Sequence, residues 1–566
     1  MKLLATIVFI IISFYTSSHG RYLHQGPHTA ESQPGISATP RPSAEATRPG
    51  VQASPLVVEG EDVYATVEQG MLRGAVVTSE LGQQYASFRG VPYAEPPVGE
   101  LRFQAPRPAA SWNGRRDALQ QAPACPQTTG RVTSEDCLYL NVFVPLGAAA
   151  APVLAWIPGG GFRVGTSEYE GPDFLVAEGV ILVAFNYRLG ALGFLSTGDE
   201  AAPGNAGLRD QMLALSWVQR NIAAFGGDPA RVTVGGESAG GCSVGDLIIS
   251  PAAAGLFQQA TIISGEAVSP WGIVTDPRRR AFALGEALGL STNDSQQLVD
   301  FLRTQDAADL ITHDGDVIPP EELIRLVAVA WGPVIDGTLI QEYPISNLKA
   351  GRFSRMPILV GYTSGDGMIG AQGKGYLSSE AAVQQLDENF VEAAAPLVRL
   401  PTADQRQDAA LRIRDFYFGN ESITLQEAQA IVDMLTDFGF VEPSDTAVRI
   451  MANQSDAAPI FYHLFDYRGP SIGNSTYGTP HGSQRSVLFS GLVTNPDEEF
   501  IQLRTNMVRL WANFVKYGTP SPEGESIEWT AFNNSDQNYM HITNIFEMKQ
   551  NVYEQRMDFW HEIMPI

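Results

Sequence analysis

The chain contains several short runs of consecutive apolar residues. Pro152–Ile157 and Val180–Phe185 are apolar along almost their whole length, which is typical of strands buried on both faces. Further runs predict strands at Arg231–Val234, Gln259–Ile263, Pro357–Val360 and 458–467. Strands of this kind are expected in the interior of a parallel sheet, where helices cover both faces.

The segment Asn205–Phe225 has a helical period instead. Its apolar residues recur at spacings of three and four, at Leu208, Met212, Leu215, Val218 and Ile222. The sequence Gly-Gly-Asp-Pro at 226–229 is a helix-stop signal. The alternation of apolar strands with such helices predicts an α/β fold, with a central, mostly parallel sheet and helices on both faces.

The N-terminal region differs in composition from the rest. Lys2 precedes the apolar run Leu3–Phe14, and small residues around Ser18 suit cleavage after Gly20, so residues 1–20 are interpreted as a signal peptide. An uncleaved anchor is the alternative. Residues 21–56 are rich in Pro, Ser, Thr, Gly and Ala and predict a disordered linker that is a candidate for O-glycosylation. Residues 57–566 are expected to form the folded domain, without a membrane span, in a secreted protein.

Secretion gives meaning to the cysteines and to the N-x-S/T sequons. Cys125 and Cys137 lie close together and are the expected disulfide, which leaves Cys242 unpaired. Five sequons are candidate glycosylation sites, at Asn293, Asn420, Asn453, Asn474 and Asn533. We expect no metal, because the cysteines lack a C-x-x-C pair or clustered histidines, and the sequence calls for no cofactor.

The net charge narrows the class of partner. The 566 residues carry 37 Lys and Arg against 62 Asp and Glu, a formal charge of −25. Nucleic acid requires a basic surface, and anionic membranes attract basic segments, so neither is an expected partner. The oligomeric state stays open.

A candidate nucleophile lies in Gly236-Glu-Ser-Ala-Gly240, which fits the pattern G-x-S-x-G. By itself the pentapeptide is weak, because glycine is abundant in this chain. Its position is more informative, because Ser238 follows the strand predicted at Arg231–Val234 and precedes the helix-like segment Gly241–Ile249. A strand, a sharp turn and a helix are the context in which this pattern carries a nucleophilic serine.

A serine nucleophile needs a base and an acid, in the chain order Ser, Asp or Glu, His for this class of fold. His481 lies in a Gly- and Pro-containing loop after the strand at 458–467, and the other seven histidines lie in less suitable places. Asp366 lies in a turn directly after the strand Pro357–Val360. The alternatives are a solvated loop histidine and an aspartate that caps a turn.

An oxyanion hole completes the candidate site. Gly160 and Gly161, in Pro158–Phe162 after the first predicted strand, offer backbone N–H groups without side chains. Together with the N–H of Ala239, they would face the oxygen on which negative charge develops during acyl transfer. A flexible glycine turn is the alternative.

Taken together, these residues resemble the cholinesterase/type-B carboxylesterase family of the α/β-hydrolase fold, from about Val57 to the end. The matching motifs are Phe88–Phe103, Ser134–Asn141, Asn186–Gly190 and Trp331–Gly337, with the nucleophile motif and Ser264-Gly265. The resemblance implies the triad Ser238, Asp366 and His481, and the oxyanion hole Gly160, Gly161 and Ala239. It also implies the family's first disulfide at Cys125–Cys137, and buried ion pairs Arg102–Glu135 and Arg188–Asp210.

The chain departs from the family pattern at several positions. Pro158 stands where the family usually has His or Tyr, and Asp366 stands where Glu is commoner. Gln484 stands at a position where a Glu commonly follows the histidine. Only 11 residues separate Cys125 from Cys137, and none is Trp. The aromatic residue that binds choline in cholinesterases is therefore missing, and the loop is too short for a large lipase lid.

The sequence therefore predicts a secreted serine carboxylesterase that hydrolyses small to medium uncharged esters through an acyl-enzyme. Phe162 and Trp271 are expected on the acyl side of the pocket, with core packing as the alternative for Trp271. Two other functions remain in view: a lipase on longer-chain esters, and a non-catalytic adhesion member of the same fold.

Overall fold

The computed structural model describes residues 56–473 and 475–566. The predicted signal peptide and almost all of the predicted linker lie outside these residues, as does the sequon asparagine Asn474. Among the described residues, no helix combines the length and the apolar character that a membrane span needs.

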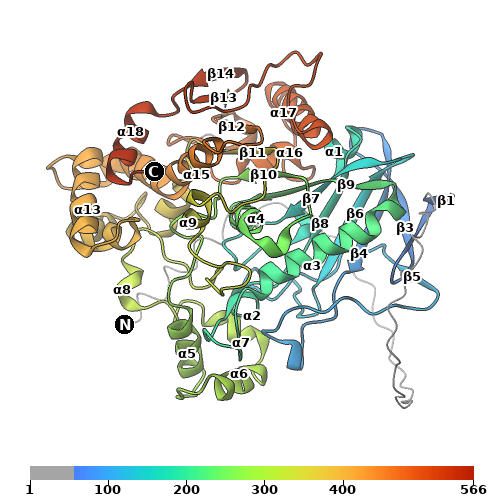
Figure 1. Ribbon diagram of the computed structural model, residues 1–566, viewed down its shortest axis with the longest axis horizontal. Helices are drawn as coiled ribbons and strands as arrows, with labels where there is room; N and C mark the ends of the chain where they lie inside the picture. Colours follow the sequence, from blue (N-terminus) through green and yellow to red (C-terminus); the bar gives the residue numbers. More distant parts are fainter. Residues whose placement is uncertain (1–55, 474) are drawn as a thin grey trace.

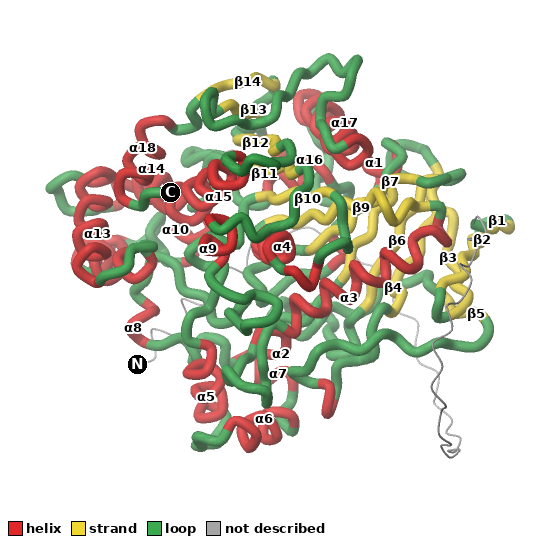
Figure 2. Tube along the Cα trace, in the orientation of Figure 1, coloured by secondary structure: helices red, strands yellow, loops and turns green. Residues whose placement is uncertain are grey.

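One large sheet runs through the protein, and Figure 2 shows its strands as a continuous band from β1 to β14. The strands are β1 (Val57–Glu59), β2 (Asp62–Val67), β3 (Gly70–Thr78), β4 (Gln84–Pro92), β5 (Arg115–Asp117), β6 (Tyr139–Pro145), β7 (Ala151–Ile157), β8 (Ile181–Phe185), β9 (Gly227–Glu237), β10 (Gln259–Ile263), β11 (Ile358–Thr363), β12 (Ile460–Phe465), β13 (Asn538–Ile542) and β14 (Phe546–Gln550). Their spatial order is β1-β2-β3-β4-β6-β8-β7-β9-β10-β11-β12-β13-β14, with β5 beside β3.

The strands from β8 to β13 pair in parallel, as the apolar runs predict. Both edges differ from that prediction, because β1 to β4 and β6 pair antiparallel at one edge and β14 pairs antiparallel at the other. The outermost of these strands, such as β1, β2 and β14, are less buried than the central ones: β2, for example, alternates between buried and partly exposed positions. Alternating strands of this kind suit an antiparallel edge.

Helices cover the sheet and fill one end of the molecule (Figure 1). They are α1 (Asp173–Ala177), α2 (Gly190–Phe194), α3 (Ala206–Asn221), α4 (Ala239–Ile249), α5 (Pro277–Ala287), α6 (Ser295–Arg303), α7 (Ala307–Thr312), α8 (Pro320–Leu323), α9 (Pro344–Lys349), α10 (Met368–Gly373), α11 (Glu380–Glu388), α12 (Phe390–Ala394), α13 (Ala403–Phe418), α14 (Ala428–Thr436), α15 (Glu442–Ala452), α16 (Ser483–Leu488), α17 (Glu498–Tyr517) and α18 (Glu554–Ile563). A π-helical turn, Asp437–Val441, joins α14 to α15.

The strand β7 shows why the central strands are apolar throughout. Val153 and Ile157 belong to one buried cluster, which includes residues of α3 and α4, whereas Leu154 and Trp156 belong to a second cluster with residues of α1 and α17. All seven residues of β7 are buried. With a core on each face, β7 carries no charged or hydroxyl side chain, and the candidate residues Gly160 and Gly161 lie beyond its end.

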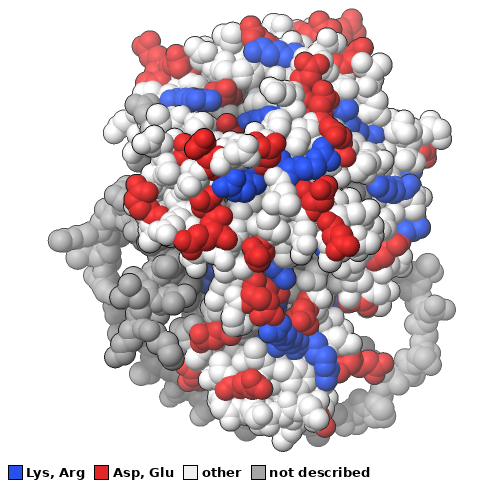
Figure 3. Space-filling model, turned by 90° about the vertical axis from the view of Figure 1, so that its left-hand side faces the viewer, with Lys and Arg blue, Asp and Glu red and all other residues white. Residues whose placement is uncertain are grey.

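Charged side chains lie on the surface. Figure 3 shows acidic side chains spread over one face of the protein, with Lys and Arg side chains between them and no broad basic patch. This distribution agrees with the acidic composition of the chain.

Some charged pairs are buried instead, and in one of them the side chains of Arg188 and Asp210 are 2% and 0% exposed. The guanidinium of Arg188 donates to both oxygens of Asp210, at 2.7 and 2.8 Å, and the Arg188 backbone N–H donates to the same carboxylate. The pair ties the segment after β8 to α3, as the family resemblance implies. Arg102 and Glu135 form the second implied pair.

Asp210→Asn should destabilise the protein by about 3–5 kcal/mol, because arginine cannot lose its proton and would be left buried without a counter-charge. Urea unfolding followed by circular dichroism would measure the change. The matched control is Glu321→Gln, which neutralises the acid of the exposed pair Arg279–Glu321 and should leave the unfolding midpoint unchanged. Equal midpoints for the two variants would contradict the assigned role of the buried pair.

Candidate active site

The candidate site residues all follow strands of the parallel region. Gly160 and Gly161 follow β7, Ser238 follows β9, Asp366 follows β11 and His481 lies in the loop after β12. The strands β7 and β9 are neighbours in the sheet, as are β11 and β12, with β10 between the two pairs. Because parallel strands end at the same edge, residues more than 300 positions apart in the sequence are brought to one place.

Ser238 occupies a strained turn between β9 and α4. Its backbone has φ 60° and ψ −123°, and the helix α4 begins at the next residue, Ala239. A Cβ on Gly240 would lie 2.1 Å from the carbonyl oxygen of Ile157, and one on Gly236 would lie 2.4 Å from the Gly240 backbone, so both glycines are required by close approach. Non-glycine residues with positive φ are uncommon and cluster at functional sites.

Asp366 and His481 are joined directly. The His481 Nδ1 atom lies 2.7 Å from Asp366 Oδ1, and the other carboxylate oxygen of Asp366 accepts a hydrogen bond from the Thr363 backbone N–H at 2.8 Å. Asp366 is completely buried. A carboxylate fixed in this way holds the imidazole in one orientation and leaves Nε2 to face the rest of the site.

Glu237 is a site residue that the sequence analysis did not single out for a role. Its Oε1 atom lies 3.2 Å from His481 Nε2, without the alignment of a hydrogen bond. Burial lowers the pKa of His481, but the Glu237 carboxylate and the Asp366 hydrogen bond outweigh burial, so the pKa of His481 is raised above its ordinary value. The sequence did offer a signal for this contact, because Glu237 directly precedes Ser238 in the motif Gly236–Gly240.

A set of hydrogen bonds that the sequence did not reveal joins the turn that contains Asp366 to the loop that contains His481. The Ser364 hydroxyl donates to Asp466 at 2.5 Å and accepts from the Thr479 backbone N–H at 2.8 Å. The Gly365 N–H donates to the Thr479 carbonyl at 3.0 Å. These contacts hold residues 364–366 and 479–481 side by side, which supports the distance between Asp366 and His481.

The glycine loop after β7 has an unusual backbone. Gly160, Gly161 and Phe162 have φ values of 120°, 61° and 59°. The Pro158 carbonyl accepts a hydrogen bond from the Tyr187 hydroxyl at 2.9 Å, and the Gly160 carbonyl accepts from the backbone N–H groups of Arg163 and Val164. These hydrogen bonds within and next to the loop make it a turn of defined shape.

The two predicted pocket residues have different surroundings. The Phe162 side chain is completely buried and packs edge-on against Phe194, with ring centroids 5.0 Å apart. Trp271 donates its indole N–H to the Gly439 carbonyl in the π-helical turn, at 3.1 Å. Phe440, in the same turn, lies 5.7 Å from the Trp271 ring and 5.2 Å from the His481 ring. Phe440 therefore connects Trp271 to the candidate base, and π-helical turns are frequent at functional sites.

The remaining predicted features are located as follows. Cys125 and Cys137 form a disulfide, and Cys242 is a buried free cysteine, as expected. The four described sequon asparagines, Asn293, Asn420, Asn453 and Asn533, are all exposed. Within the described residues, no group of His, Cys, Asp and Glu is arranged to hold a metal ion.

Two acids are buried beside the helix that follows Ser238. Asp246 in α4 is completely buried, and neither of its carboxyl oxygens has a hydrogen-bond partner among the described residues. Glu266 is also buried, one of its oxygens lacks a partner, and burial raises its pKa to about 8. Burial and the neighbouring Glu266 raise the pKa of Asp246 well above its ordinary value. Burial thus favours the neutral, protonated form of both groups.

Glu237→Gln should move the acidic limb of the pH–activity profile to lower pH. The raised pKa of His481 means that the imidazole is protonated, and inactive as a base, up to a higher pH than usual; removing the carboxylate lowers that pKa. The profile of kcat/KM for an aryl ester between pH 5 and 9 measures the shift. Glu168→Gln, a change at an exposed acid, is the control. An unmoved limb would show that Glu237 does not act on the imidazole.

Comparison of the sequence with known proteins shows the family to which the chain belongs. The sequence model of the carboxylesterase family matches residues 61–560. Juvenile hormone esterase of Tribolium castaneum is 35% identical over 87% of this chain and 92% of its own length. Cholinesterase of Mus musculus is 31% identical and acetylcholinesterase of Bungarus fasciatus is 33% identical, each over 89% of this chain and 87% of its own length. This chain therefore belongs to the carboxylesterase family and is a carboxylic ester hydrolase.

Proposed function

We propose that the protein is a serine carboxylesterase with Ser238 as nucleophile, His481 as general base and Asp366 as the acid that orients it. The observation that carries the proposal is the 2.7 Å contact between Asp366 and His481 at the same sheet edge as the strained turn of Ser238. The contact of Glu237 with His481 Nε2 supports the proposal further, because Glu237 precedes Ser238 directly in the chain.

The reaction proceeds in two halves. His481 Nε2 takes the proton of the Ser238 hydroxyl while the oxygen attacks the ester carbonyl carbon, and the imidazolium then protonates the departing alcohol. The acyl group stays on Ser238 Oγ. In the second half, His481 takes a proton from water, the hydroxide oxygen attacks the acyl carbon, and the proton returns to Ser238 as the carboxylic acid leaves. The negative charge of Asp366 stabilises the imidazolium in both halves.

The N–H groups of Gly160, Gly161 and Ala239 are proposed to stabilise the carbonyl oxygen as it becomes negative. Ala239 opens α4, so the positive end of that helix adds to the same effect. The absence of side chains at Gly160 and Gly161 supports this role, because no Cβ at these two positions hinders the approach of an oxygen to their N–H groups.

The proposed substrates are uncharged esters with a small to medium acyl group. Two of the relatives above are named for choline esters, but the loop between Cys125 and Cys137 is short and lacks a tryptophan. Phe440 and Trp271 are proposed to limit the acyl side, since the Phe440 ring packs against His481 and the Trp271 ring packs against Phe440. A lipase on longer chains is the second candidate, and acyl-chain preference separates the two.

We also propose that the protein is secreted, with residues 57–566 as a single catalytic domain. The apolar N-terminus, the disulfide Cys125–Cys137 and the four exposed sequon asparagines all support an oxidising, extracellular destination.

Ser238→Ala should abolish hydrolysis of p-nitrophenyl acetate, with kcat/KM at least about 10⁴-fold lower, because no other hydroxyl can form the acyl-enzyme. It should also abolish covalent labelling by a fluorophosphonate probe. The matched control is Ser250→Ala, at the other end of α4, where the hydroxyl has no hydrogen-bond partner among the described residues. Hydrolysis that survives in Ser238→Ala sinks the assignment, and an unlabelled, inactive wild type favours a non-catalytic member of the fold.

Phe440→Leu should widen the acyl side and raise the preference for hexanoate over acetate esters, measured as the ratio of kcat/KM values, by about tenfold. Removing bulk beside an acyl chain is worth about 1–3 kcal/mol per methylene that the pocket gains. Phe438→Leu is the control, because Phe438 lies in the same π-helical turn but packs on Trp560. Equal ratios of kcat/KM in the two variants would contradict the assignment of Phe440 to the acyl side of the pocket. A wild type that already prefers long chains would favour the lipase.

A further inference from the structure

The loop that carries Gly160 and Gly161 has a backbone that needs support from outside. Between Pro158 and Thr166, four residues have positive φ: Gly160, Gly161, Phe162 and Gly165. The left-handed region is unfavourable for a non-glycine residue such as Phe162, and glycines are the residues with the most conformational freedom to lose. Such a loop keeps one shape only where neighbouring groups hold it.

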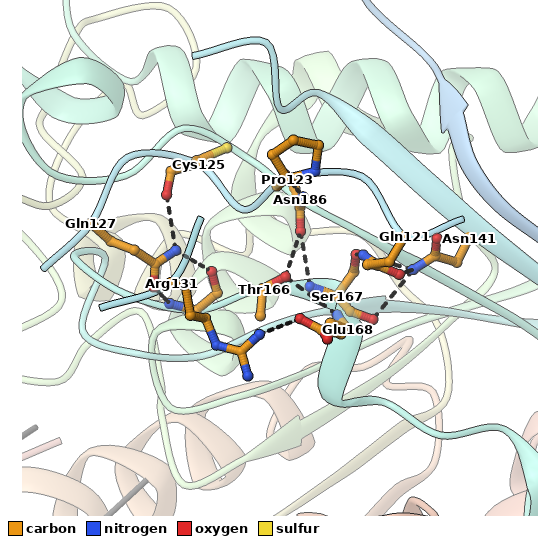
Figure 4. A network of polar contacts seen from close by, with 11 residues as sticks. Gln121, Pro123, Cys125, Gln127, Arg131, Asn141, Thr166, Ser167, Glu168 and Asn186 are labelled. Atoms are coloured by element: carbon orange, nitrogen blue, oxygen red, sulfur yellow. Dashed lines mark hydrogen bonds and ion pairs between the residues drawn. The ribbon is translucent and has the colours of Figure 1, made fainter. Parts of the chain in front are cut away.

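The Gln127 side chain, which belongs to the disulfide-bonded segment, forms hydrogen bonds with Gly165 in the second half of this loop. The Gln127 amide oxygen accepts from the Gly165 N–H at 2.9 Å, and its nitrogen donates to the Gly165 carbonyl at 2.8 Å and to the Cys125 carbonyl at 3.0 Å (Figure 4). Gln127 is 6% exposed. The side-chain amide thus pairs with both backbone groups of one glycine, as a neighbouring strand would.

Gly165 in turn is in direct contact with the oxyanion half of the loop. A Cβ on Gly165 would lie 2.3 Å from the Gly159 carbonyl oxygen, and a Cβ on Gly160 would lie 2.1 Å from the Val164 carbonyl oxygen. The Val164 N–H donates to the Gly160 carbonyl at 3.0 Å. The two halves of the loop are packed backbone against backbone, so a force that fixes Gly165 also fixes the peptides of Gly160 and Gly161.

The segment that carries Gln127 is itself anchored. The disulfide joins Cys125 to Cys137, and the Asn186 side chain donates to the carbonyls of Pro123 and Cys137 at 3.1 and 3.2 Å. The Asn186 oxygen accepts from the Ser167 N–H, just beyond the oxyanion loop, at 2.9 Å. Gln127 therefore transmits the position of a cross-linked, hydrogen-bonded segment to the glycine loop.

We propose that Gln127 is a positioning residue for the oxyanion hole: it holds Gly165 and, through Gly165, sets the direction of the Gly160 and Gly161 N–H groups. This inference rests on the proposed function, because it takes those N–H groups as the oxyanion donors. Such a residue contributes to the transition state and little to binding of the ester, since the negative oxygen exists only after attack.

Gln127→Met keeps the length of the side chain and removes all three hydrogen bonds. We expect kcat for p-nitrophenyl acetate to fall about ten- to hundredfold with KM within about twofold, because a donor misplaced by a fraction of its hydrogen-bond length loses most of its effect. Affinity for an aryl trifluoromethyl ketone, whose adduct with the serine carries a negative oxygen, should fall by a similar factor. Hydrogen exchange of residues 158–166 should become faster.

Gln121→Met is the matched control. Gln121 belongs to the same polar network, where it contacts Asn141 and Ser167 but not Gly165. It should leave kcat, ketone affinity and exchange of the glycine loop within about twofold of wild type. If Gln127→Met does not yield folded protein by circular dichroism, Gln127→Asn replaces it, and the same separation of kcat from KM is required.

The outcomes separate this inference from the proposed function. A wild type without esterase activity or fluorophosphonate labelling overturns both. An active, labelled wild type in which Gln127→Met behaves like Gln121→Met overturns the role of Gln127 alone. A rise in KM without a loss of kcat, or faster exchange without a loss of ketone affinity, also overturns it.

Discussion

Burial of the central strands on both faces is the constraint on which the rest of this protein depends. A strand such as β7 has side chains in one core on one face and in a second core on the other, and none of its side chains is charged or nucleophilic. Polar chemistry is therefore displaced to the strand ends. Because the strands are parallel, those ends lie at one edge, and four separate loops meet there with Gly160, Ser238, Asp366 and His481.

The same constraint explains what sequence reasoning could predict. Apolar runs identify buried strands whatever their neighbours, so the predicted strands at Pro152–Ile157 and Gln259–Ile263 correspond to β7 and β10. A helix with a clear period is also readable: Asn205–Phe225 forms α3 followed by a short 3₁₀ turn, and it ends where Gly226 takes a left-handed conformation. The disulfide and the buried ion pair Arg188–Asp210 were implied by family motifs and are present.

Contacts between distant loops were beyond that reasoning. Gln127 and Gly165 are 38 positions apart, and Ser364 and Thr479 are 115 apart, so no local period or spacing connects them. Gly439 and Pro443 mark an irregularity in the helix at the π-helical turn Asp437–Val441, but they do not show what the turn contacts, so Phe440 was not foreseen beside His481. The outer strands β1, β2 and β14 have a weak, partly exposed pattern, which explains why they were not predicted, whereas β4 and β6 were missed although most of their residues are buried. Candidate catalytic residues can be recognised from sequence motifs. The residues that position them are brought near by the tertiary fold and have no such motif.

The buried acids Asp246, in α4, and Glu266 make the stability of the folded protein depend on the pH of the medium. Glu266 holds its proton in the folded protein up to about pH 8 but would release it near its ordinary value of 4.5 once unfolded. The unfolded chain therefore binds fewer protons than the folded one over that interval, and stability declines as pH rises through it. Asp246 adds to the decline in the same direction. The helix that begins beside Ser238 is thus a proton-dependent part of the core, and the fold is weakened there as the pH rises through this interval.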